Sequence, residues 1–136
     1  MTAAAKAGFS LLEMLIVLAI MAISVAVAVP RGRAVLDQMI THAVFFDFQR
    51  QVSDLRRQAY AAQTPVTIKG DLDADPRDAL DRQIFLRASW TYRLTRPIVI
   101  SEGGVCTPAT VEVLKAGRSI MHLTMADDLC HFIRQD

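Results

Sequence analysis

One carboxylate stands where a charged group is costly. Glu13 lies near the start of an apolar run between Phe9 and Val29 that contains no other charged residue. An ionised acid inside a membrane-length helix is expensive, so it usually marks a function. Opposite charges attract strongly in low dielectric, whereas each alone is costly to bury. Glu13 therefore indicates assembly with another chain rather than catalysis, although it could also simply reach the lipid headgroups from the first turns of the helix.

Two cysteines, Cys106 and Cys130, lie in the last third of the chain. If this part is exported to an oxidising compartment, we expect a disulfide between them. Closing that loop would stabilise the fold by about 3 kcal/mol in the chain-entropy model. The alternative is a zinc site that recruits His122 and His131. Their spacing fits no standard zinc pattern, so we expect no metal.

Three aspartates, Asp71, Asp73 and Asp75, alternate along a polar stretch. Oxygen ligands at alternate positions open the calcium loop of an EF-hand. That pattern then requires Gly and, at its twelfth position, Glu, but this chain has Pro76 and Arg82 there. We therefore expect a solvated acidic loop.

A later segment gathers the aromatic and basic residues Trp90, Tyr92, Arg93 and Arg96. These side chains could stack the bases of single-stranded DNA. They also alternate along a possible strand, and we expect them to cover its solvent face. The whole chain balances 15 Lys and Arg against 14 Asp and Glu, which gives no basic footprint for nucleic acid. It contains no GxSxG, HExxH, Walker or CxxC motif, so we expect neither an enzyme nor a cofactor.

The apolar run from Phe9 to Val29 must position Glu13. As a helix rising about 1.5 Å per residue, it would be about 31 Å long, close to the thickness of a bilayer core. One interpretation is an ordinary membrane anchor. Another is a secretory signal peptide with Lys6 before its apolar region and a small-x-small cleavage site at Ala26-Val27-Ala28. An acid at the start of the apolar block is unusual in a signal peptide.

The segment Gly8-Phe9-Ser10-Leu11-Leu12-Glu13 offers a third interpretation, because it resembles the processing site of type IV pilins and type II secretion pseudopilins. The resemblance implies that prepilin peptidase removes a leader, residues 1–8, by cutting after Gly8. It also implies N-methylation of Phe9 and pairing of Glu13 with the amine of a neighbouring subunit. The proline frequent at the twenty-second mature position of the family falls on Pro30.

Beyond Pro30, apolar residues recur every three or four positions and predict an amphipathic helix over residues 31–64 that ends before Thr64-Pro65. We expect Phe45, Phe46 and Phe48 to be core. Short β-rich runs follow in residues 65–136, with strands expected at 66–69, 84–94, 98–101, 110–114 and 119–125. The predicted fold is α+β, with a long helix (membrane-spanning at 9–30) packed on a small antiparallel β-domain.

The passages 54–59 and 64–68, and the late runs around Gly103-Gly104, also resemble the H-type pseudopilins and the FimT/FimU minor pilins. This resemblance implies a minor pseudopilin of a type II secretion system, held by one span in a bacterial inner membrane with its β-domain in the periplasm. The implied partners are the major G-type and minor I-, J- and K-type pseudopilins, prepilin peptidase, the assembly platform and membrane lipid.

Two alternatives remain open from the sequence: a minor type IV pilin, active in pilus assembly or DNA uptake, and a soluble module released after Ala28. The charges flanking the apolar run oppose the periplasmic orientation, since Arg31 and Arg33 follow it and only Lys6 precedes it. The free amine at the N-terminus adds one charge to the preceding side.

Overall fold

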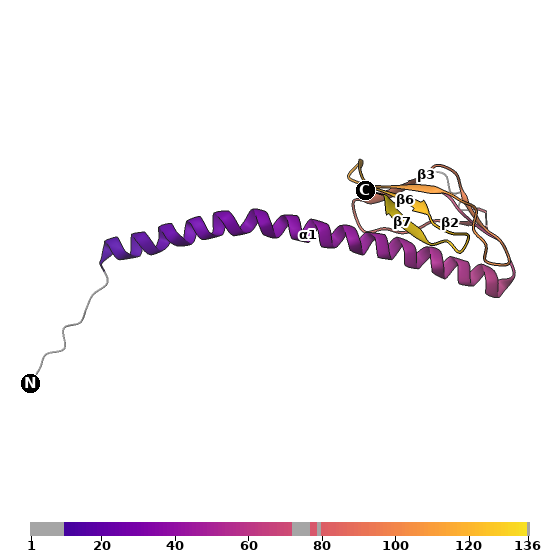
Figure 1. Ribbon diagram of the computed structural model, residues 1–136, viewed down its shortest axis with the longest axis horizontal. Helices are drawn as coiled ribbons and strands as arrows, with labels where there is room; N and C mark the ends of the chain where they lie inside the picture. Colours follow the sequence, from indigo (N-terminus) through magenta and orange to yellow (C-terminus); the bar gives the residue numbers. More distant parts are fainter. Residues whose placement is uncertain (1–9, 72–76, 79, 136) are drawn as a thin grey trace, which may run out of the picture. The chain divides into compact units, whose positions relative to one another are not determined.

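The computed structural model describes residues 10–71, 77, 78 and 80–135. In these residues a long helix is followed by short strands (Figure 1). The helix is α1 (Leu11–Ala62), and the strands are β1 (Val66–Ile68), β2 (Asp81–Arg82), β3 (Trp90–Leu94), β4 (Ile98–Ile100), β5 (Thr110–Lys115), β6 (Arg118–Met125) and β7 (Phe132–Gln135). The α+β layout predicted from the sequence is confirmed.

Helix α1 runs through Pro30 and ends at a defined cap. Gln63 follows its last residue with a positive φ of 49°. The Gln63 N–H donates to the Tyr60 carbonyl and the Thr64 N–H donates to the Ala59 carbonyl, which is the hydrogen-bond pattern of a Schellman motif. Pro65 then prevents the helix from continuing.

The chain divides into two compact units, Met1–Thr41 and His42–Asp136. In the first unit, the described residues belong to the N-terminal part of α1 and the residue that precedes it. The second unit, called the head below, combines residues 42–62 of α1 with the strands.

The head contains two sheets. In the first, the strand order is β2-β1-β4, with β1 parallel to β2 and antiparallel to β4. In the second, the order is β3-β5-β6-β7 and every neighbouring pair is antiparallel. The head is thus mostly antiparallel, as predicted, and its one described parallel pair joins two short strands.

The core of the head forms where one face of α1 meets the sheets. Its helix residues, spaced by whole turns, are Val44, Phe48, Val52 and Ala59. The Phe48 ring meets those of Tyr92 and Phe132 edge-on, at centroid distances of 5.8 and 5.3 Å. Such aromatic pairs stabilise a core beyond the area that they bury.

The predicted aromatic cluster is only partly core. Phe48 is fully buried and Phe45 half-buried, but Phe46 is 65% exposed. Adjacent helix positions point about 100° apart, so the three rings cannot share one buried face. The prediction of core burial was therefore wrong for Phe46.

The prediction for Trp90 and Tyr92 was also wrong, because both are buried, with 7% and 3% exposure. Strand alternation places these two residues on the inner face and Thr91 and Arg93 on the outer face. The Tyr92 hydroxyl can be buried because it has hydrogen-bond partners on both sides, Ile84 N and Lys69 O. Neither buried ring can serve as a platform for stacking bases.

Strand boundaries also differ from the prediction. Of the expected strand 84–94 only β3 is formed, because the backbone N–H groups of Ile84 and Phe85 bond to side chains instead of to a strand. Strands β2 and β7 were not expected. The first has only two residues, and the second contains Arg134 and Gln135, which weaken an apolar pattern.

Candidate functional site

Glu13 occupies the first turn of α1. Its backbone N–H donates to the Ser10 carbonyl over 3.0 Å, which closes the turn. A carboxylate in this position interacts favourably with the positive end of the helix dipole. The side chain is exposed and forms no ion pair with the described residues. Glu13 is therefore open to a cation supplied by another molecule.

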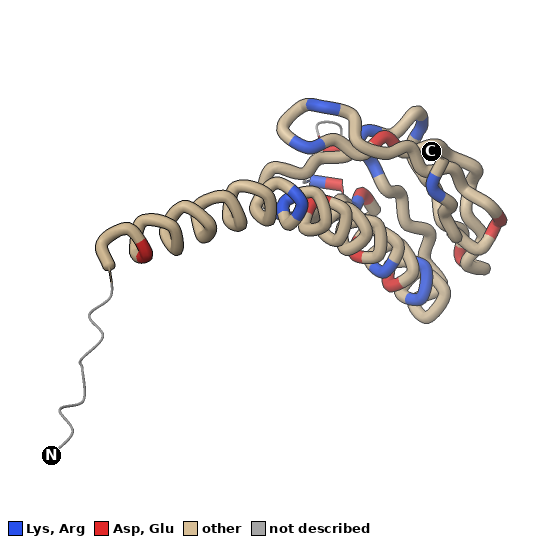
Figure 2. Tube along the Cα trace, turned by 60° about the vertical axis from the view of Figure 1, so that its left-hand side comes forward, with Lys and Arg blue, Asp and Glu red and all other residues tan. Residues whose placement is uncertain are grey.

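The part of α1 around Glu13 presents an apolar surface on all sides. Figure 2 shows a single red position at its start and then an uninterrupted tan stretch. Its large side chains are exposed, from Leu11 at 79% to Val29 at 45%. The helix contains an 18-residue window with a mean hydropathy of 2.7, long and apolar enough to cross a membrane. This surface requires lipid or other apolar helices around it.

Of the other residues predicted for processing and assembly, the structure describes Pro30. Gly8 and Phe9, the expected cleavage and methylation site, lie outside the described residues. Pro30 lies inside α1. Its ring removes one backbone N–H from the helix without ending it.

Two glutamine side chains of α1 bond to the backbone of segments that follow the helix in the head. Gln49 Oε1 accepts the Phe132 N–H (2.8 Å), and its Nε2 donates to the Cys130 carbonyl (2.9 Å). Gln51 makes the same pair with one residue, Phe85, through the N–H at 2.9 Å and the carbonyl at 2.7 Å. Each side-chain amide thus supplies one donor and one acceptor, as the backbone of a neighbouring strand would. No signal in the sequence singled out either residue.

The C-terminal turns of α1 meet the loop between β4 and β5. Arg56 Nε donates to the Gly104 carbonyl over 2.7 Å. Gly104 has a φ of +75°, and a Cβ there would lie only 3.4 Å from Arg56 Nε. Glycine is therefore favoured at this position by both backbone conformation and space. No signal in the sequence indicated the arginine partner of this turn.

Tyr92 links the two sheets. Its hydroxyl donates to the Lys69 carbonyl (2.6 Å) and accepts the Ile84 N–H (3.0 Å). Its own backbone N–H donates to Asp71 Oδ2 over 3.1 Å. Burial raises the pKa of Tyr92 to about 12, and the nearby Asp71 charge adds to the rise. Burial likewise raises the pKa of Asp71, against the lowering effect of the Tyr92 N–H.

Cys106 and Cys130 form a disulfide, with their Cα atoms 5.5 Å apart. The same loop is held by the Cys106 N–H, which donates to the Asp128 carbonyl over 2.8 Å. Beside it, Asp127 Oδ2 lies 2.7 Å from His131 Nδ1. This hydrogen bond lowers the pKa of Asp127. The bridge joins the segment after β4 to the segment before β7.

Among the described residues, the histidines of the alternative zinc site each bond to a different neighbour. Asp73 and Asp75 lie outside the described residues, while His122 bonds to Ser119 and His131 to Asp127. Across the described part of the chain, no group of three or more His, Cys, Asp or Glu could hold an ion.

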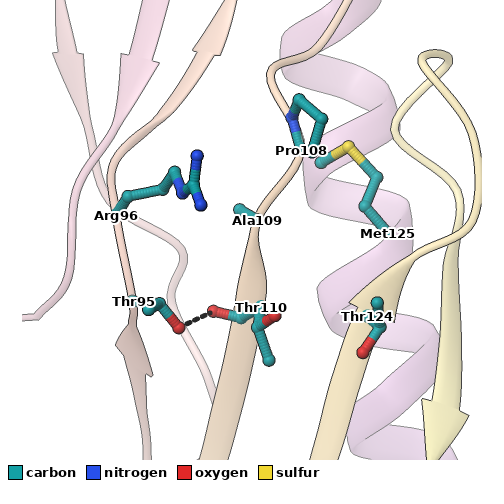
Figure 3. Close-up of a pocket in the computed structure, with 7 residues that line it drawn as sticks. All are labelled: Thr95, Arg96, Pro108, Ala109, Thr110, Thr124 and Met125. Atoms are coloured by element: carbon teal, nitrogen blue, oxygen red, sulfur yellow. Dashed lines mark hydrogen bonds between the residues drawn. The ribbon is translucent and has the colours of Figure 1, made fainter.

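Arginines line several hollows on the head, including the two that follow. Figure 3 shows the first, about 130 Å³, where Arg96 extends from the end of β3 towards Ala109 and Thr95 bonds to the Thr110 carbonyl. The second, about 240 Å³, is lined by Arg56, Arg57, Tyr60 and Gly103. Both are shallow features of a folded surface and neither holds a set of catalytic groups.

Comparison with known proteins identifies the N-terminal segment. Residues 4–29 match the family model of the prokaryotic N-terminal methylation motif. The match indicates the type IV pilin or pseudopilin class, whose members are structural rather than enzymatic. It implies processing by prepilin peptidase, assembly with other pilin-like subunits and anchoring in a membrane. No curated protein and no solved structure matches the chain.

Proposed function

We propose that the chain is a minor, H-type pseudopilin of a type II secretion system. Prepilin peptidase cuts after Gly8, and Phe9 becomes the methylated N-terminus. Residues 9–30 cross the inner membrane once, residues 31–64 continue the helix and residues 65–136 form the periplasmic β-rich domain. The subunit joins major G-type and minor I-, J- and K-type pseudopilins on the assembly platform, in a filament that drives protein export.

One observation carries the proposal: Glu13 lies in the first turn of an exposed apolar helix, within the matched methylation motif. The cleavage that the motif implies would create a cationic amine at Phe9. Glu13 would then meet the amine of a neighbouring subunit in a medium of low dielectric constant. An ion pair in that setting holds only if both charges are present.

Replacing Glu13 tests the proposal in cells that carry the partner subunits. We expect Glu13→Ala to lower incorporation into the filament at least tenfold, because removal of one partner from a buried ion pair costs about 3–5 kcal/mol. The head should retain its Cys106–Cys130 disulfide. Asp128→Ala is the matched control, since it removes an exposed acid from the head.

Incorporation of Glu13→Ala at the wild-type level would contradict the proposed role of this carboxylate. A minor type IV pilin shares the same motif, so a second assay separates the two systems. Deletion of the gene should abolish export of secreted proteins and leave surface pili intact. The opposite result would assign the subunit to a pilus.

A further inference from the structure

The hollow lined by Arg56, Arg57, Tyr60 and Gly103 lies entirely within the head, between the end of α1 and the loop after β4. Its volume of about 240 Å³ is that of a site for one side chain rather than for a large ligand. Its chemistry is set by the guanidinium groups and the phenol of three residues from one helix.

One hydrogen bond fixes the Arg56 guanidinium and leaves its other donors available to a ligand. Its Nε–H is fixed on the Gly104 carbonyl at 2.7 Å, and its two terminal nitrogens have no hydrogen-bond partner among the described residues. A guanidinium whose position is fixed by one bond loses little entropy when it binds through the others. Those remaining N–H groups match the two oxygens of a carboxylate.

The other side chains limit the charge of the ligand. Arg57 is already paired with Asp54, so one positive charge remains uncompensated in the hollow. Tyr60 is 61% exposed, and its hydroxyl bonds to no described residue. Glu102, next to Gly103, forms no ion pair with either arginine in the described structure. One cation and one neutral donor suit a monoanion better than a phosphate dianion.

We infer that this hollow binds an acidic side chain from the head of a neighbouring pilin-like subunit. The inference rests on the proposed function, which places such subunits beside one another. Arg56 pairs with both carboxylate oxygens, and the Tyr60 hydroxyl donates to one of them. Gly103 keeps the hollow open because it carries no side chain.

A substitution at Gly103 can test the role of the hollow. Its φ is not in the left-handed region, and the nearest atom to an added Cβ is Ser101 Oγ at 3.8 Å. Gly103→Leu should therefore fill the hollow without straining the loop. Gly104, with its positive φ and its contact with Arg56, cannot be used in this way.

The test uses the full chain in cells with its partner subunits. A benzophenone amino acid at position 102 captures the neighbour, and mass spectrometry identifies the captured peptide. We expect a segment of a pilin-like subunit that contains Asp or Glu. Arg56→Met should lower the yield about tenfold and Tyr60→Phe about threefold, as for loss of a charged and a weaker hydrogen bond. Gly103→Leu should reduce it as strongly as Arg56→Met.

Arg96→Met is the matched control, because Arg96 lines the other hollow and has no ion pair among the described residues. Its yield should equal that of the wild type. Arg56→Glu should abolish capture, and replacement of the captured acid by arginine on the partner should restore it.

Capture of lipid alone, or yields that Gly103→Leu and Tyr60→Phe leave unchanged, would overturn the inference. The mass of the N-terminus, measured on the same samples, keeps the two proposals apart. A processed and assembled subunit with an insensitive hollow refutes only the acidic-site inference, whereas an unprocessed chain refutes both.

Discussion

At the scale of single residues, the head depends on polar side chains that satisfy buried backbone groups. Tyr92 is the strongest case, because its hydroxyl serves both Ile84 N and Lys69 O while its ring packs on Phe48. A phenylalanine would fill the same space, but the buried Ile84 N–H would lose this acceptor and the Lys69 carbonyl would lose one hydrogen bond. A buried donor left without a partner loses the full free energy of its hydration.

Tyr92→Phe should therefore lower the free energy of unfolding of the head by about 2 kcal/mol. Urea titration of the detergent-solubilised chain would measure it, with the buried Trp90 as the fluorescent probe, since the chain contains one tryptophan. Tyr60→Phe is the control, because Tyr60 is exposed and its hydroxyl has no bond to the described residues. Equal midpoints for the two variants would contradict the role of Tyr92 as the link between the sheets.

Asp71 gives a prediction about pH. Burial raises its pKa in the folded state above the ordinary 3.8, so the ionised carboxylate opposes folding. The protonated form of Asp71 therefore favours the fold below the unfolded pKa, and that advantage is lost as pH rises through the folded pKa. Asp71→Asn keeps an oxygen for the Tyr92 N–H and should stabilise the head at pH 7. Unfolding titrations at pH 7 and pH 3 should show this gain at pH 7 only.

At the scale of elements, α1 is held by side-chain amides in addition to its apolar face. Gln49 bonds to two partly buried backbone groups, while those that Gln51 serves on Phe85 are exposed. Water can replace Gln51 more easily than Gln49.

Gln49→Ala should accordingly lower the free energy of unfolding by about 2 kcal/mol, and Gln51→Ala by less. Arg50→Ala, an exposed position between them, should have no measurable effect. Thermal unfolding of the three variants in the same detergent would rank them. A larger loss for Gln51 than for Gln49 would contradict this account of the attachment.

The elements also show what the sequence could predict. Helix α1 and the strands β1, β4, β5 and β6 were expected near their observed places, because their periodicity and their Gly and Pro boundaries are local signals. The buried face of β3 was not predicted correctly. Trp90 and Tyr92 alternate with Thr91 and Arg93, and either set could have faced inward. The partners of Gln49, Arg56 and Tyr92 depend on contacts between distant segments, which no local pattern records.

At the scale of the whole molecule, the N-terminal unit and the head have different requirements. The head buries its own core and closes one loop with a disulfide. The described N-terminal helix buries none of its apolar window. Glu13 is the one charge in that exposed surface between Leu11 and Val29. A molecule of this kind is complete only with lipid or other helices around it.

Processing at Gly8 would create the amine that Glu13 is proposed to meet. The direct test is the intact mass of the mature chain, with sequencing of its N-terminal peptide. We predict a chain that starts at Phe9 and carries one methyl group on its amine. A chain that starts at Val29, after cleavage behind Ala28, would contradict the account and leave a soluble module without Glu13.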